Sequence, residues 1–160
     1  MDYTARIDAL LGPDSEGIRL NAVSTLHGSA TINGTSGPMG NDTDAKLFAA
    51  LRDWADVTVV GSATVKAESY GPASNTRLAI LSHSLDFAGF EDLIASGPIV
   101  LTPEERASSP EAQHLVEAGA DVLSIGTGTM SEAISALRAR GARRISCLLY
   151  TSDAADEEDS

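Results

Sequence analysis

The chain has 160 residues, of which 42% are hydrophobic, and a formal net charge of −12. It contains no run of about 18 apolar residues, so no membrane-spanning helix is expected, and its acidity argues against binding to nucleic-acid phosphates. The single cysteine, Cys147, excludes an internal disulfide and a Cys-based zinc cluster, and the three histidines lack metal-ligand spacing, so no metal site is expected. The N-terminus lacks the basic-then-apolar layout of a secretion signal, which predicts a cytoplasmic location.

The first predicted strand covers residues 18–25, and a polar, glycine-rich loop follows it through Gly40. Asn41 or Asp42 can cap a helix over residues 42–54. The apolar residues of that segment fall on one helical face, and they are Leu47, Phe48, Leu51 and Trp54.

Strands and helices alternate through the rest of the chain. Residues 57–60 predict a strand closed by Gly61, with a helix beginning at Ser62. Further strands are predicted at 78–82, 99–102, 122–125 and 143–146, and further helices at 110–118 and 130–140. This alternation predicts one α/β domain with a doubly wound, mostly parallel sheet.

The last fourteen residues, CLLYTSDAADEEDS, depart from this pattern, because the strand that begins at Arg143 runs into a charged, low-complexity tail. A natural acidic tail is one interpretation. The other is that residues 147–157 match the translation of a transposon-adapter end common in shotgun libraries. We therefore expect residues 1–146 to be a partial domain whose C-terminal strands are missing, and residues 147–160 to be a non-native, adapter-derived tail.

Three polar clusters follow predicted strands, where open α/β sheets bind ligands. Residues 61–64 (GSAT) can hold a phosphate at a helix start, or Ser62 and Thr64 can simply act as caps. Residues 82–84 (SHS) can contact a 2′-phosphate or ribose, or serve as turn formers. Residues 126–129 (GTGT) lack the third glycine of a nucleotide fingerprint, and we predict a turn with Thr129 as the helix N-cap.

Arg52 lies beside the apolar stripe of the 42–54 helix, with Asp53 and Asp56 nearby. One interpretation is a surface salt bridge. The other is a guanidinium directed at an anionic substrate.

Residues 17–146 resemble the reductase domain of the bifunctional riboflavin-biosynthesis deaminase-reductase, especially its stand-alone actinobacterial relatives. The motifs that carry the resemblance are LNAVSTLHG, an SG followed by a capped helix ending in LR, and VGSATVKAE. The resemblance implies a dihydrofolate reductase-like fold, homodimerisation of the full-length form and NADPH as cofactor. It also implies reduction of 5-amino-6-(5-phosphoribosylamino)uracil, in which hydride reaches C1′ of the opened sugar imine and gives the ribitylamino product.

Carried over by position, the resemblance implies cofactor and substrate contacts but assigns no catalytic residue. The implied NADPH contacts are the Val23 backbone, Pro38, Thr64, Glu68, and Ser82 or His83, and the implied substrate contacts are Ser36 and Arg52.

The sequence departs from the family pattern at four places, one of which is the missing basic residue shortly after Gly71-Pro72, unless Arg77 replaces it. His27 stands where an aspartate is usual, the acidic pair is Glu68-Ser69, and the Gly-Gly-Pro-rich loop expected after Ser146 is absent. Because that loop would bind the cofactor pyrophosphate, we expect this chain itself to bind NADPH poorly and to be inactive. The alternatives are a reductase of dihydrofolate-like pterins or other small imines, a non-catalytic NADPH-binding module, or an α/β domain without a ligand.

Overall fold

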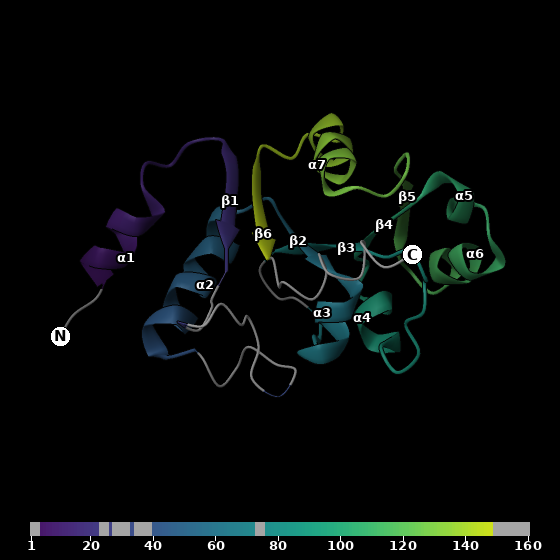
Figure 1. Ribbon diagram of the computed structural model, residues 1–160, viewed down its shortest axis with the longest axis horizontal. Coiled ribbons are helices and arrows are strands. Elements are labelled where there is room, and N and C mark those ends of the chain that lie inside the picture. Colours follow the sequence, from purple (N-terminus) through teal and green to yellow (C-terminus); the bar gives the residue numbers. More distant parts are fainter. Residues whose placement is uncertain (1–3, 23–25, 27–32, 34–39, 73–75, 149–160) are drawn as a thin grey trace.

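The computed structural model describes residues 4–22, 26, 33, 40–72 and 76–148. Six strands form one all-parallel sheet in the order β1-β6-β2-β3-β4-β5 (Figure 1). The strands are β1 (Gly17–Asn21), β2 (Val57–Gly61), β3 (Arg77–Leu81), β4 (Ile99–Thr102), β5 (Asp121–Ser124) and β6 (Arg144–Leu148).

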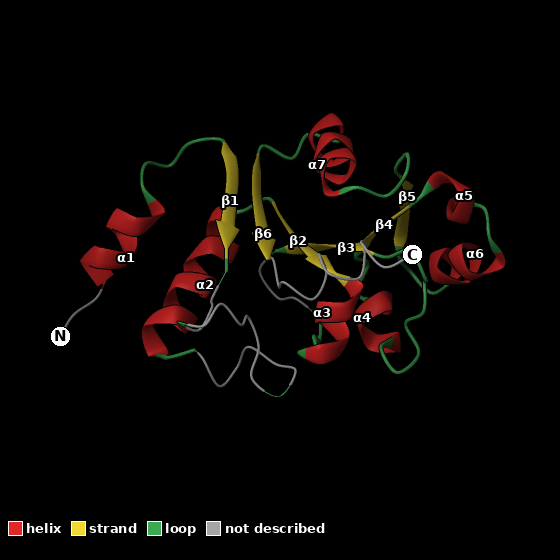
Figure 2. Cartoon of the chain, viewed as in Figure 1, coloured by secondary structure: helices red, strands yellow, loops and turns green. Residues whose placement is uncertain are grey.

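Helices connect the strands and cover both faces of the sheet (Figure 2). They are α1 (Thr4–Leu11), α2 (Asp42–Trp54), α3 (Ser62–Ala67), α4 (Glu91–Ala95), α5 (Glu104–Ala107), α6 (Pro110–Glu117) and α7 (Met130–Ala139). The predicted doubly wound, parallel α/β architecture is confirmed. The sequence did not predict α1, α4 or α5. The first strand ends at Asn21, and residues 23–25 of its predicted range lie outside the described residues.

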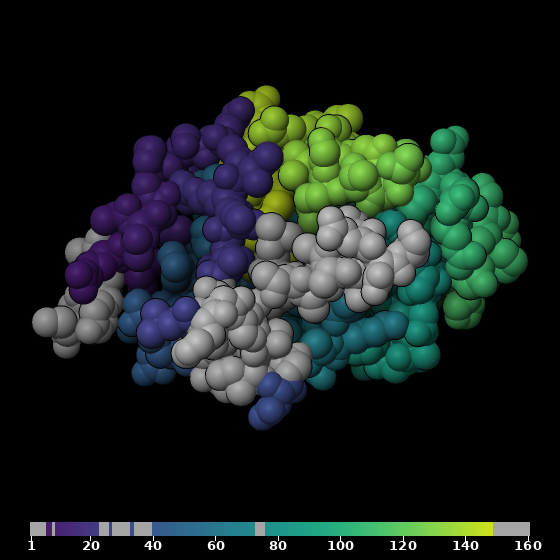
Figure 3. Space-filling view, viewed as in Figure 1, coloured from purple at the N-terminus to yellow at the C-terminus, as the bar shows by residue number. Residues whose placement is uncertain are grey.

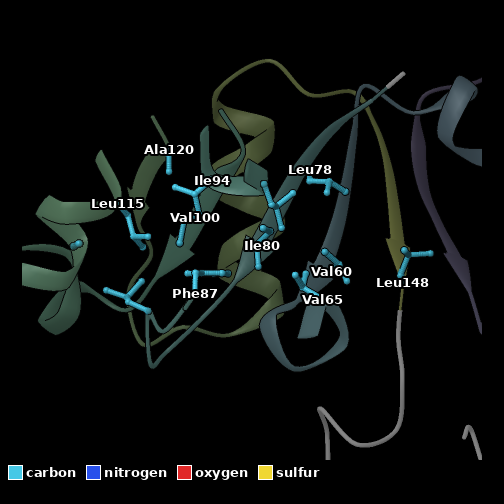
Figure 4. Packing of buried hydrophobic residues seen from close by; sticks show 13 residues of the cluster. Val60, Val65, Leu78, Ile80, Phe87, Ile94, Val100, Leu115, Ala120 and Leu148 are labelled. Carbon is cyan, nitrogen blue, oxygen red and sulfur yellow. The ribbon is translucent and has the colours of Figure 1, made fainter. Parts of the chain in front are cut away.

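Two hydrophobic clusters form the core, one on each face of the sheet. Strand alternation sends Val60, Ile80 and Val100 to one face, where they pack with residues of α3, α4 and α6 (Figure 4). The opposite face packs Val59, Leu101 and other strand residues against α7. The α5–α6 segment and α1 lie at opposite ends of the molecule (Figure 3).

Strand β6 lies between β1 and β2, although it is the last strand in the described chain. Asp56, just before β2, fixes where β6 begins, because its carboxylate accepts the backbone N–H groups of Arg143 and Arg144 at 2.9 Å each. These backbone hydrogen bonds, together with the Arg144 guanidinium, lower the pKa of Asp56. β6 continues to Leu148, two residues beyond the predicted strand, and Cys147 and Leu148 are buried.

Helix α2 has the predicted bounds because a side chain caps its start and because one of its faces carries apolar side chains that pack inward. Asn41 Oδ1 accepts the N–H groups of Thr43 and Asp44 at 3.0 Å each, so Asn41 rather than Asp42 is the N-cap. The face predicted to be apolar buries Leu51 and Trp54. No helix in the described parts of the chain is long and apolar enough to span a membrane.

A substitution in β6 should show how much the sheet depends on this strand. Ile145 is fully buried, and its neighbour in β1, Ile18, is 44% exposed. We expect Ile145→Ala to lower the free energy of unfolding by about 2–5 kcal/mol, and the matched control Ile18→Ala to lower it by about 1 kcal/mol or less. Urea unfolding followed by circular dichroism measures both, and equal losses would contradict the central placement of β6.

Candidate functional site

The C-terminal ends of β2 and β3 bring two of the sequence clusters to one edge of the sheet. Gly61 and Leu81 are register partners, so the α3 start that carries Thr64 and the turn that begins at Ser82 follow neighbouring strands. Thr64 is 3% exposed and Ser82 is 1% exposed. Gly61, rather than Ser62 or Thr64, occupies the N-cap position of α3.

Residues 82–84 form a turn, which is one of the two roles that the sequence allowed for them. Ser82 Oγ accepts the N–H of Leu85 at 3.0 Å, and Ser84 Oγ accepts the N–H of Asp86 at 3.4 Å. His83 Nε2 lies 3.2 Å from the carbonyl oxygen of Gly128, a contact that requires a proton on Nε2. Ser84 is exposed and its hydroxyl proton is not used by these bonds, so the turn can still donate to an oxygen of a ligand through Ser84.

The 126–129 segment leads into α7, and the carboxylate of Glu132 in that helix accepts its free hydrogen-bond donors. Glu132 accepts hydrogen bonds from the backbone N–H groups of Thr127 and Thr129 and from both threonine hydroxyls, at 2.9–3.1 Å. Thr129 Oγ1 accepts the N–H of Glu132 in return, so the predicted Thr129 N-cap is confirmed as part of a capping box. These bonds lower the pKa of Glu132 to about 2. Two of the amides that a phosphate would need here are therefore already taken.

Arg52 reaches a cavity of about 170 Å³ between α2 and the segment after α3. Its wall is formed by Phe48 and Arg52 of α2, Thr58 of β2, Leu78 of β3, Leu148 of β6 and residues 70–72. The guanidinium carbon of Arg52 lies 5.4 Å from the centre of the Phe48 ring. Within the described residues no acidic group pairs with Arg52, and Asp56 pairs with Arg144 instead. The described residues therefore do not show the ion pair between Arg52 and Asp56 that the first interpretation allowed.

Thr58 adds a polar group that the sequence reasoning missed. Its side chain is fully buried on the wall of the Arg52 cavity, and its hydroxyl has no hydrogen-bond partner among the described residues. A buried hydroxyl without a partner is costly, so this atom favours a polar occupant of the cavity. The available signal was a threonine within the apolar run 57–60, at a position that alternation sends inward.

The remaining predicted site residues fall in different places. Glu68 follows α3 as its C-cap and is half-buried, two residues before the cavity wall begins at Tyr70. Val23, Ser36 and Pro38 lie outside the described residues.

A second crevice, of about 480 Å³, lies at the ends of β4 and β5. Glu104 and Glu105 line it together with Pro103, Gly126 and Thr127, so its charge disfavours an anionic ligand. In the described part of the chain, no group of three or more His, Cys, Asp or Glu side chains could hold a metal ion.

Comparison with solved structures identifies reductase-related proteins of the same fold. The chain has 33% sequence identity with a pyrimidine reductase-like protein of Corynebacterium diphtheriae, at a TM-score of 0.73, over 84% of this chain and 65% of that one. It has 17% identity with RibD of Acinetobacter baumannii, at a TM-score of 0.60, over 86% of this chain and 40% of that one. It also has 17% identity with the riboflavin biosynthesis reductase Rib7 of Saccharomyces cerevisiae, at a TM-score of 0.55, over 86% of this chain and 63% of that one.

These similarities show that the chain has the fold of the riboflavin-pathway reductases, the dihydrofolate reductase-like fold that the sequence predicted. The chain spans less than two thirds of the length of each of these proteins. No family model and no curated protein sequence matches it.

The capping box predicts a pH-dependent contribution of Glu132 to stability. Its folded-state pKa of about 2 lies below the ordinary value of 4.5. The contribution is therefore fully present above pH 4.5 and is lost as the pH falls toward 2. We expect Glu132→Gln to lower the melting temperature at neutral pH, and the difference from the wild type to shrink over that acidic range. Glu117→Gln, an exposed change on α6, is the control, and a difference independent of pH would contradict the role of the carboxylate.

A substitution at Gly128 tests the contact with His83. Gly128 has φ of +92°, and an added Cβ would lie 2.6 Å from His83 Nε2 and 2.7 Å from Pro103 Cγ. Gly141 has a similar φ of +95° with open space around its Cβ position. We expect Gly141→Ala to cost about 1–2 kcal/mol of stability through backbone strain alone. Gly128→Ala should cost more because of the added clash. Equal losses in urea unfolding would mean that the His83 turn is not tightly packed.

Proposed function

We propose that the chain belongs to an NADPH-dependent pyrimidine reductase that acts on a phosphoribosylaminopyrimidine. The observation that carries the proposal is the convergence of Arg52 and the unpartnered Thr58 hydroxyl on one cavity. The 33% identity with a pyrimidine reductase-like protein of the same fold supports the assignment.

The Arg52 cavity would receive the anionic end of the substrate. A guanidinium forms strong, charge-assisted hydrogen bonds with phosphate oxygens, and the stacking of Arg52 near Phe48 restricts its motion. Thr58 would donate its hydroxyl to the same group. A cavity of about 170 Å³ is smaller than typical sites for whole ligands, so it would hold one group of the substrate and leave the pyrimidine outside.

Thr64, Ser82 and His83 fit a cofactor phosphate at the ends of β2 and β3. All three follow neighbouring strands at the edge where α/β sheets bind nucleotides. His83 is exposed at this edge, and Thr64 and Ser82 are buried behind it. When bound, NADPH would supply the hydride. The role of the chain is to hold the cofactor and the substrate in contact and to exclude water.

The ends of β4 and β5 do not suit the phosphates of the cofactor. The amides of Thr127 and Thr129 are bonded to Glu132, and Glu104 and Glu105 add negative charge beside them. We therefore assign the adenosine phosphate to the β2–β3 end, where the predicted contacts Thr64, Ser82 and His83 lie.

Replacement of Arg52 tests the proposed substrate contact. We expect Arg52→Gln to weaken binding of the phosphoribosylaminopyrimidine by about 10- to 100-fold, because a hydrogen bond to a charged group contributes about 1.5–3 kcal/mol. Isothermal titration calorimetry measures the affinity of each variant for this substrate, a readout that needs neither NADPH nor turnover.

Arg138→Gln is the matched control, because Arg138 is exposed on α7 at the opposite face of the sheet. Dihydrofolate serves as the competing substrate. Preferential binding of dihydrofolate, or equal effects of the two arginine substitutions on substrate binding, would overturn the proposal.

A further inference from the structure

A larger cleft lies between α4 and α6 and shares no lining residue with the Arg52 cavity. It has a volume of about 690 Å³, within the range of small-molecule binding sites. Residues 84–88, which follow β3, close it on a third side. Helix α6 packs on β5, at one end of the sheet. Helix α2 packs on β6, toward the other end. The cleft therefore belongs to a different part of the molecule from the Arg52 cavity.

The floor of the cleft is apolar and rigid. It is formed by Leu85, Phe87, Ile94 and Leu115, which are 2–6% exposed and belong to the core cluster. Figure 4 shows Phe87, Ile94 and Leu115 gathered around Val100 of β4. Because these side chains are held by the sheet behind them, the hollow is a built feature of the core and does not depend on a surface loop alone.

The rim of the cleft carries three carboxylates. They belong to Asp86, Glu91 and Glu111, and no lysine or arginine is among the described residues that line the cleft. The pKa of each carboxyl is lowered: by Lys66 at Asp86, and by backbone N–H groups at the helix starts for Glu91 and Glu111. All three are therefore ionised at neutral pH.

The three carboxylates differ in how far they are already neutralised. Lys66 Nζ lies 2.9 Å from Asp86, and Arg106 Nη2 lies 3.8 Å from Glu111. No cation of the described chain pairs with Glu91, whose carboxylate accepts the backbone N–H of Gly89. Glu91 is therefore the carboxylate most open to a cation brought by a ligand.

We propose that the α4–α6 cleft binds a small molecule with an apolar, ring-containing body and a primary amine. The body would cover the Leu85–Phe87–Ile94–Leu115 floor, and the ammonium group would bind Glu91 at the rim. The same charges disfavour NADPH and a sugar phosphate, so this site would take a different chemical class from the reductase site.

Three probes of matched shape test the proposal on the whole chain. They are tryptamine, tryptophol and indoleacetate, which carry an amine, an alcohol and a carboxylate on the same indole body. We expect tryptamine to bind at least about tenfold more tightly than tryptophol, because its hydrogen bond to Glu91 is charge-assisted. Indoleacetate should bind most weakly. Isothermal titration calorimetry measures all three.

Two variants locate the binding and one controls for charge. Glu91→Gln keeps an oxygen for the Gly89 N–H but removes the charge, so it should reduce tryptamine binding to the level of tryptophol. Ala118→Phe, which fills the cleft, should abolish binding of both probes. Glu117→Gln changes an acidic residue of α6 that does not line the cleft, and it should leave both affinities unchanged. Absence of tryptamine binding, or an amine preference that survives Glu91→Gln, would overturn the proposal.

Discussion

The pairing of β6 between β1 and β2 is the constraint on which the rest of the structure depends. β1 has no other partner in the described sheet, so β6 alone joins it to the remaining strands. The Asp56 carboxylate sets the start of β6 by accepting two consecutive backbone N–H groups. A slip of one residue would turn Ile145 and Cys147 away from α7 and disrupt both core clusters.

The same arrangement positions the proposed substrate cavity. The chain leaves β1, crosses β6 with α2 and enters β2, and this crossing brings Arg52 over Thr58 and Leu78. Charge then separates the surfaces of the molecule. Arg52 offers a cation over the middle strands of the sheet, the Glu132 carboxylate occupies the amides at the α7 start, and Glu91 presents a carboxylate between α4 and α6. Each surface therefore favours ligands of a different charge.

Local signals in the sequence predicted the longer elements well. The α2 bounds followed from a cap and an apolar stripe, and the α7 start followed from Thr129. The five-residue α4 and the four-residue α5 were missed because they are too short to display a helical period. The position of β6 was also beyond sequence reasoning, because strand order is set by contacts between distant residues.

The sequence also could not settle which side chains meet in the candidate site, because that depends on contacts between distant residues. The position of Arg52 beside an apolar stripe left a salt bridge and a ligand contact open, and the pairing of Asp56 with Arg144 could not be read from that position. Thr58 was missed because a buried threonine in a strand is usually satisfied by a neighbour. The absence of a hydrogen-bond partner is a property of the fold and cannot be read from residue type.

The edge position of β1 has a consequence for how copies of the chain behave together. Ile18 and Leu20 are 44% and 58% exposed on this strand, and no strand of the described chain pairs with its outer side. An apolar, unpaired edge is a template for association with another strand. The net charge of −12 opposes such association by mutual repulsion, and dissolved salt screens that repulsion. Colloidal stability therefore depends on ionic strength: dilute buffer keeps copies apart, and concentrated salt allows their edges to meet.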